Sequence, residues 1–153
     1  MAKILIIEDE LEQPVEDNMF ILYLIQSNHN LSYATSGDEA WDLLANNQFD
    51  LVYFDIMLTP SNEDTIKTEE LRKVRRPDVG VFILENIRKG TFEPTGTPKN
   101  VATLVISAVT GFERWNKIKK LTGDERYLTK PCSPELIFER IQLIINESGA
   151  ANE

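Results

Sequence analysis

The chain contains little of what disulfide-stabilised or membrane-embedded proteins rely on. Among its 153 residues there is one cysteine, Cys132, which excludes an internal disulfide framework and favours a reducing, cytoplasmic setting. No apolar run approaches the length of a membrane span, and the N-terminal stretch MAKILIIEDE lacks the layout of a signal peptide. Cys132 is therefore interpreted as a small core residue.

Positive charge is also scarce. Sixteen Lys and Arg against 25 Asp and Glu give a formal net charge of −9, and such a negative field repels phosphate backbones. We therefore expect neither direct binding to nucleic acid nor an attached DNA-binding module. A hydrophobic content of 42%, with seven Gly and seven Pro, is typical of one globular domain and not of a disordered chain.

What the chain does contain is an alternation of short buried strands and helices. Strands are predicted at 3–7, 31–35, 49–55, 100–108 and 126–129. Helices are predicted at 15–28, 36–47, 79–90, 111–121 and 133–148. In the first helix, Met19, Leu22 and Ile25 recur at helical spacing, which indicates a helix. This alternation predicts a parallel sheet with helices on both faces, which binds ligands beyond the carboxyl ends of its strands.

Several single residues have predicted places in these elements. Ser36 and Ser133 are expected to be helix N-caps, and Gly90 is expected to close the helix that precedes it. His29 follows the first helix and is expected to face solvent. Trp41 is expected to pack the second helix against the sheet.

Polar side chains follow the predicted strands at their carboxyl ends. They include Glu8, Asp9, Glu10, Asp55, Ser107 and Lys130. Asp55 follows the apolar run LVYF, and burying an unpaired carboxylate is costly, so we expect Asp55 to reach solvent or to meet a cation. Oxygen ligands with room for waters suit Mg²⁺. With Lys130 nearby, the set favours phosphoryl transfer onto the Asp55 carboxylate.

In this order and spacing, these landmarks resemble the receiver domain of bacterial two-component response regulators, of the single-domain chemotaxis-regulator type. The matching features are Glu8-Asp9, Asp55, Ser107-Ala108 and the stretch YLTKP at 127–131. The resemblance runs from about residue 3 to residue 147. It implies a doubly wound, flavodoxin-like α/β fold with five parallel strands in the order 2-1-3-4-5. The expected domain covers 1–148, and 149–153 form a flexible tail.

The resemblance also implies a role for each site residue. Asp55 would be the phosphoacceptor for a histidine kinase or a histidine phosphotransfer protein. Lys130 would pair with the phosphoryl group, Ser107 would move toward it on activation, and Tyr127 would turn inward into the vacated space. Glu8 would hold a water bound to the metal. The implied Mg²⁺ site comprises Glu8, Asp9, Asp55 and the backbone carbonyl of Met57.

Two departures from the family pattern have consequences. The segment at about 60–78 is an insertion, either a solvated surface loop or a partner-docking or lid element. In the second case, Arg75 or Arg76 would approach the phosphoryl group.

Met57 and Val109 occupy the two positions that tune access of water to the acyl phosphate in this family. Both are apolar, which predicts slow self-dephosphorylation.

The sequence is compatible with three functions. The first is a stand-alone phosphorylatable switch, not an enzyme with turnover, that signals to an unknown downstream protein. Trp115 would then belong either to the core or to the surface that the family commonly uses for partners. The second is a phosphorylation-independent receiver-like interaction module, although such proteins usually lack the acceptor or the lysine. The third is an aspartyl-nucleophile hydrolase, which wants Asp-x-Asp where this chain has Met57.

Overall fold

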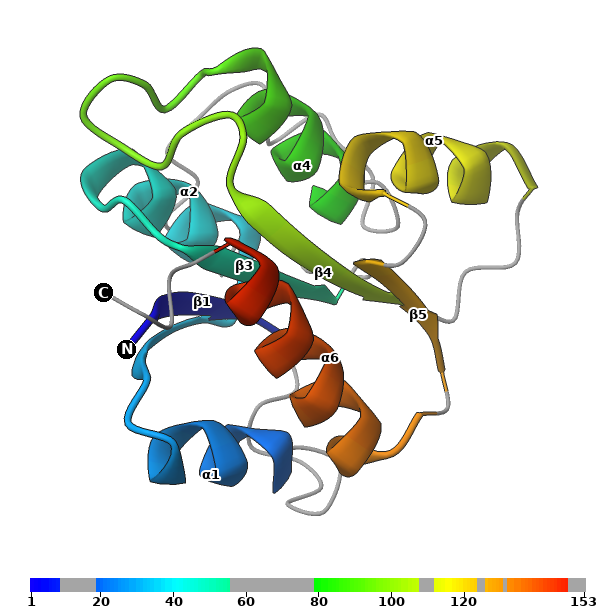
Figure 1. Cartoon of the computed structure of the whole chain (residues 1–153). Helices are drawn as coiled ribbons and strands as arrows, with labels where there is room; N and C mark the ends of the chain where they lie inside the picture. Colours follow the sequence, from blue (N-terminus) through cyan, green and yellow to red (C-terminus); the bar gives the residue numbers. More distant parts are fainter. Residues whose placement is uncertain (9–18, 56–78, 108–111, 124–125, 131, 149–153) are drawn as a thin grey trace.

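Strands and helices alternate along the chain in a computed structural model that describes residues 1–8, 19–55, 79–107, 112–123, 126–130 and 132–148 (Figure 1). The strands are β1 (Lys3–Ile7), β2 (Asn30–Ala34), β3 (Leu51–Asp55), β4 (Ala102–Ser107) and β5 (Tyr127–Thr129). The helices are α1 (Met19–Gln26), α2 (Gly37–Asn46), α4 (Val79–Lys89), α5 (Phe112–Thr122) and α6 (Pro134–Ser148). Within these residues, no helix is long and apolar enough to cross a membrane.

The five strands form one parallel sheet in the order β2-β1-β3-β4-β5. Helices α1 and α6 cover one face, and α2, α4 and α5 cover the other (Figure 1). The predicted doubly wound fold and its strand order are therefore confirmed. The winding reverses between β1 and β3, the position at which sheets of this type place their ligand sites.

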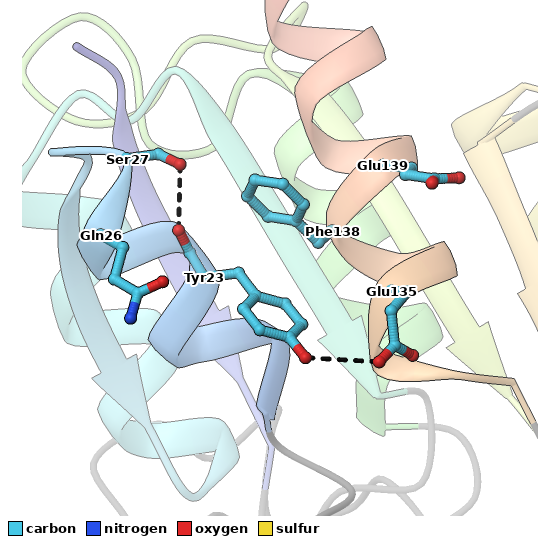
Figure 2. A pocket seen from close by; sticks show the side chains of 6 residues that line it. All are labelled: Tyr23, Gln26, Ser27, Glu135, Phe138 and Glu139. Carbon is cyan, nitrogen blue, oxygen red and sulfur yellow. Dashed lines mark hydrogen bonds between the residues drawn. The ribbon is translucent and has the colours of Figure 1, made fainter.

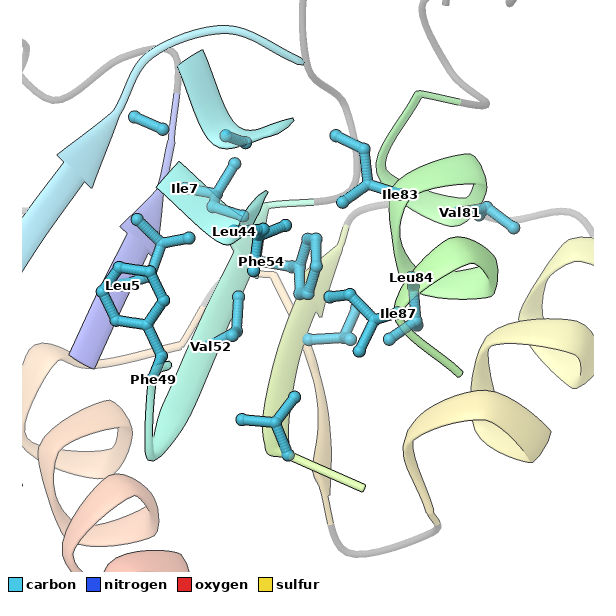
Figure 3. Packing of buried hydrophobic residues seen from close by; sticks show 14 of the residues in the cluster. Leu5, Ile7, Leu44, Phe49, Val52, Phe54, Val81, Ile83, Leu84 and Ile87 are labelled. Carbon is cyan, nitrogen blue, oxygen red and sulfur yellow. The ribbon is translucent and has the colours of Figure 1, made fainter. Parts of the chain in front are cut away.

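Strand β3 supplies side chains to two separate hydrophobic cores. Val52 and Phe54 pack with residues of α2 and α4 (Figure 3), whereas Leu51 and Tyr53 pack beneath α1 and α6. Successive side chains of a strand point to opposite faces, so one apolar run fills both cores. All four side chains are at most 2% exposed. A strand covered on both sides is apolar throughout, which accounts for the uninterrupted sequence LVYF.

The predicted helix caps are confirmed. The Ser36 hydroxyl accepts a hydrogen bond from the Glu39 backbone N–H at 3.3 Å, at the start of α2. The Ser133 hydroxyl accepts one from the Leu136 N–H at 3.1 Å, at the start of α6. Gly90 follows α4 with a φ of 82°, a conformation that favours glycine.

The buried face of α1 does not coincide with the residues whose spacing indicated the helix. Phe20 and Leu24 are its buried residues, whereas Leu22 is 46% exposed and Ile25 is 50% exposed. The reason is that the seven residues from Met19 to Ile25, MFILYLI, are all apolar or aromatic, so their spacing does not select one face. The predicted helix is confirmed, but the spacing of Met19, Leu22 and Ile25 does not identify its buried face.

The predicted solvent-facing position of His29 is wrong. The backbone N–H of Ala2 donates to His29 Nδ1 at 3.1 Å, and His29 Nε2 lies 2.8 Å from the side-chain oxygen of Gln142. The half-buried ring thus links the start of β1 to α6. These residues are far apart in the sequence, so local sequence patterns do not predict their contact. Trp41 packs against Phe82 and Phe92, as predicted for helix packing.

Arg88 forms hydrogen bonds to the ends of neighbouring elements on the side of the sheet opposite the carboxyl ends of the strands. Arg88, in the last turn of α4, donates to the carbonyl of Leu121 at 2.7 Å and to those of Lys99 and Val101 at 2.8 Å. Its remaining nitrogen donates to the Thr103 hydroxyl at 2.9 Å. Burial, and then the charge of Arg126, lower the pKa of Arg88. The guanidinium therefore joins α4, the end of α5 and the start of β4.

Replacing Arg88 by Met is expected to lower the free energy of unfolding by about 2–4 kcal/mol, because the carbonyl groups lose charged donors in a partly buried site. Urea unfolding measures the change. The matched control is Lys89→Met, which removes the neighbouring exposed lysine and should change stability by less than about 0.5 kcal/mol. Equal effects of the two substitutions would contradict the assigned role of Arg88.

Candidate functional site

The register of the sheet brings the carboxyl ends of four strands to one edge. Ile7 pairs with Phe54, so Glu8 and Asp55 occupy the next positions on neighbouring strands. On the other side of β3, Asp55 pairs with Ile106, and Ser107 follows directly. Neighbouring strands lie about 4.8 Å apart. The backbone therefore places Asp55 between Glu8 and Ser107 along this edge.

Glu8 is a buried carboxylate at the end of β1. It is 5% exposed, and its backbone N–H donates to the carbonyl of Ala34 at 2.9 Å, which continues the pairing of β1 with β2. A carboxylate removed from water needs a compensating charge or hydrogen bond. A buried carboxylate at this position suits a small, hard cation, which it can bind directly or through a water on the metal.

Ser107 and Lys130 lie on adjacent strands and are joined through the backbone. The Lys130 N–H donates to the Ser107 carbonyl at 3.0 Å, which fixes the end of β5 against β4. Ser107 is completely buried, whereas Lys130 is exposed. The sheet edge therefore combines an enclosed hydroxyl with an amine at the solvent boundary, next to the position of Asp55.

Tyr127 occupies the core side of this edge. Its ring is buried and meets the ring of Trp115 edge-on, with centroids 6.1 Å apart. Within the described residues its hydroxyl makes no hydrogen bond of standard geometry. Burial raises the pKa of Tyr127, and the nearby Ser107 hydroxyl partly offsets this effect. The two predicted switch residues thus lie beside each other, with Tyr127 already buried.

Sequence patterns alone did not reveal the contact between Trp115 and Tyr127. Trp115 packs against the core beneath α4 and α5, and Lys119 Nζ lies 4.0 Å from the centroid of its ring. The core alternative for Trp115 is therefore supported, and a role of Trp115 in a partner surface stays a prediction. The spacing of four residues between Trp115 and Lys119 was the available signal for their contact.

Several predicted site features lie outside the described residues. They are Asp9, Met57, Val109, the Asp55 side chain, the insertion at about 60–78 and the tail at 149–153. In the part of the chain that is described, no group of three or more His, Cys, Asp or Glu could hold a metal. The Mg²⁺ site therefore stays a prediction, and the buried carboxylate of Glu8 is the described feature that fits it.

The pKa of Tyr127 predicts a pH dependence of stability. Above about pH 10 the unfolded chain loses the phenol proton before the folded chain does, because burial raises the folded pKa. The folded state then holds more protons, so stability should fall as pH rises through this range. Urea unfolding at several pH values should show a steeper loss for the wild type than for Tyr127→Phe. Parallel profiles would contradict the burial of this hydroxyl.

Comparisons with solved structures give a consistent fold. No protein family model matches the chain, and no curated protein matches its sequence. Solved structures do match. The receiver domain of the Francisella response regulator 1452 gives a TM-score of 0.67 at 19% identity, covering 97% of this chain and 99% of that one.

Two further structures agree with this match. A CheY-like response regulator receiver domain protein from Methanospirillum hungatei gives a TM-score of 0.67 at 18% identity, with 98% of both chains covered. The non-phosphorylated HemR receiver domain from Leptospira biflexa gives 0.67 at 23% identity, covering 95% of this chain and 94% of that one. The chain therefore has the fold of response regulator receiver domains.

Proposed function

We propose that the chain is a response regulator receiver domain that accepts a phosphoryl group on Asp55 and signals through protein contacts in the cytoplasm. The donor is a histidine kinase or a histidine phosphotransfer protein. The observation that carries the proposal is the sheet register, which sets Asp55 between Glu8 and Ser107 on the edge that Lys130 also reaches. The receiver-domain fold supports it independently.

The proposed chemistry is a transfer between two side chains. A carboxylate oxygen of Asp55 attacks the phosphorus of a phosphohistidine, the P–N bond breaks, and the imidazole nitrogen keeps the electron pair. The Lys130 ammonium offsets charge on the phosphoryl oxygens, and Ser107 donates its hydroxyl hydrogen to one of them. When bound through Asp9, Asp55, the Met57 carbonyl and a water on Glu8, Mg²⁺ supplies further positive charge beside these oxygens.

The output follows from the neighbours of Ser107. Movement of its hydroxyl toward the phosphoryl group takes that hydroxyl away from the neighbouring Tyr127 hydroxyl. The Tyr127 ring contacts the Trp115 ring, and the ammonium group of Lys119 lies over the Trp115 ring on α5. A change at the sheet edge is thereby transmitted to the surface of α5, where a downstream protein would detect it.

The alternatives are less well supported. An interaction module without phosphorylation would not need an aspartate and a lysine at these two positions. A hydrolase would need a second acid two residues after Asp55, where the chain has Met57. The product of the proposed chemistry is a modified protein, so the chain has no turnover on a separate substrate.

Incubation with Mg²⁺ and a small phosphoryl donor such as acetyl phosphate should add one phosphoryl group to the intact protein. The adduct should be absent in Asp55→Asn because the nucleophile is gone, and intact-protein mass spectrometry measures both results. The control is Asp42→Asn, which changes a carboxylate of α2 and should leave the adduct unchanged. No adduct on the wild type would favour the interaction module, and turnover without an adduct would favour the hydrolase.

The apolar residues flanking the site predict a long-lived acyl phosphate. The Met57→Asn variant should lose phosphate about tenfold faster than the wild type, because an amide side chain orients an attacking water and methionine does not. The loss is followed by mass spectrometry after the donor is removed. A wild type that loses phosphate as quickly as the variant would exclude this role for Met57.

A further inference from the structure

Strand β2 forms an outer edge of the sheet. It pairs with β1 on one side, and among the described residues no further strand pairs with its other side. The N–H of Asn30 and the carbonyl of Ala34 bond to residues that flank β1, at 2.9 Å each. Because successive residues of a strand turn their backbone groups to opposite sides, those of Leu31 and Tyr33 point away from β1. Each of these two residues therefore presents an N–H and a carbonyl to the outside of the sheet.

Strand β2 has none of the features that usually protect a sheet edge. Such edges are commonly protected by charged side chains, by proline, by a bulge or by a very short strand. The β2 strand has five residues, Asn-Leu-Ser-Tyr-Ala, and pairs with β1 in unbroken register. The other outer strand, β5, has three residues and is followed in the sequence by Lys130 and Pro131. Of the two outer strands, β2 is therefore the one suited to pair with a further strand.

The segment that carries this edge is uncharged. Residues 18–37 contain no Asp, Glu, Lys or Arg over 20 positions, although these four residue types make up 27% of the chain. The uncharged segment includes all of α1 and β2. Two copies of a chain with a formal net charge of −9 repel each other. An uncharged flank is where they can approach with the least repulsion, so the charge distribution favours a second copy as the partner of β2.

Helix α1 places apolar side chains next to this edge. One flank of α1 lines a cleft against α6 with Glu135 and Glu139, and the Tyr23 hydroxyl donates to Glu135 at 3.3 Å (Figure 2). Because α6 packs over β4, the opposite flank of α1 lies on the side of β2. Ile21 and Ile25 stand about 160° around the helix from Tyr23, and Ile25 is 50% exposed. This flank therefore adds apolar surface beside the edge without adding charge.

We propose that two copies of the chain pair through β2, antiparallel and about a two-fold axis at Ser32, so that their two sheets become one continuous sheet. In this register Leu31 of each copy stands opposite Tyr33 of the other, and each such pair exchanges two backbone hydrogen bonds. The Leu31 side chain lies on the face of α1, and Tyr33, two residues later, shares that face. Each pair therefore also joins an aliphatic and an aromatic side chain across the seam. The strand is thus self-complementary, as a two-fold interface requires.

The expected dimer is weak and is strengthened by salt. Two short strands with the adjoining flanks of α1 bury less surface than a standard protein interface, so association should depend strongly on concentration. Salt screens the repulsion between two chains of net charge −9, so the dissociation constant should fall as salt is added. An interface held by ion pairs would respond in the opposite direction. Pairing through β2 goes beyond the proposed function and does not require phosphorylation of Asp55.

Sedimentation equilibrium of the full-length chain, from micromolar to millimolar concentration, measures the association. Tyr33→Lys should raise the dissociation constant about tenfold, because it places two like charges beside the two-fold axis. Tyr33→Pro should have a similar effect, because it removes an outward N–H and leaves the bonds to β1 in place. The matched control is Leu143→Lys, which makes the same change of charge at a residue of α6 that is 50% exposed. Its dissociation constant should stay within about twofold of the wild type.

Amide hydrogen exchange of the wild type tests the same pairing without a substitution. Exchange at Leu31 and Tyr33 should slow as the concentration rises, because their N–H groups become bonded in the dimer. A chain that stays monomeric at millimolar concentration in high salt would overturn the proposal, as would equal weakening in Leu143→Lys. Protection of Leu31 and Tyr33 that persists on dilution would make a segment of the same chain the occupant. Asp55→Asn should associate as the wild type does, so a failure of phosphorylation would not affect this result.

Discussion

Parallel pairing of β3 between β1 and β4 is the interaction on which the other features depend. Its register fixes which residues of LVYF enter which core, and a slip by one residue would send each side chain to the wrong face. The same register places Asp55 beside Glu8 and Ser107. Formation of the two cores and assembly of the sheet edge are therefore one event, because no separate interaction is needed to bring these residues together.

The two faces of the sheet differ in the side chains that lie between the helices and at the surface. On the face of α2, α4 and α5, a buried aromatic contact runs from Tyr127 through Trp115 to Lys119 at the surface. On the face of α1 and α6, a cleft with two glutamates lies beside exposed leucine and isoleucine side chains.

Local patterns in the sequence were sufficient for much of the fold. Caps at Ser36 and Ser133, the glycine after α4 and the apolar strands each depend on neighbouring residues, and the structure has them as predicted. The solvent-facing position predicted for His29 is wrong, because its ring bonds to Gln142 of α6, more than a hundred residues away. The positions of Asp55 and Ser107 along one edge follow from strand order. The contact of Tyr127 with Trp115 does not, because it depends on how α5 packs.

The most direct measurement of the central claim is backbone NMR of the chain on addition of beryllofluoride with Mg²⁺, which together stand in for a phosphoryl group. The amide resonances of Glu8, Asp55, Ser107 and Lys130 should shift together at a stoichiometric concentration. Resonances at the opposite ends of the strands, such as those of Lys3 and Ala102, should stay in place. Spectra that do not change, or shifts scattered over the whole sheet, would contradict a single site built from the carboxyl ends of four parallel strands.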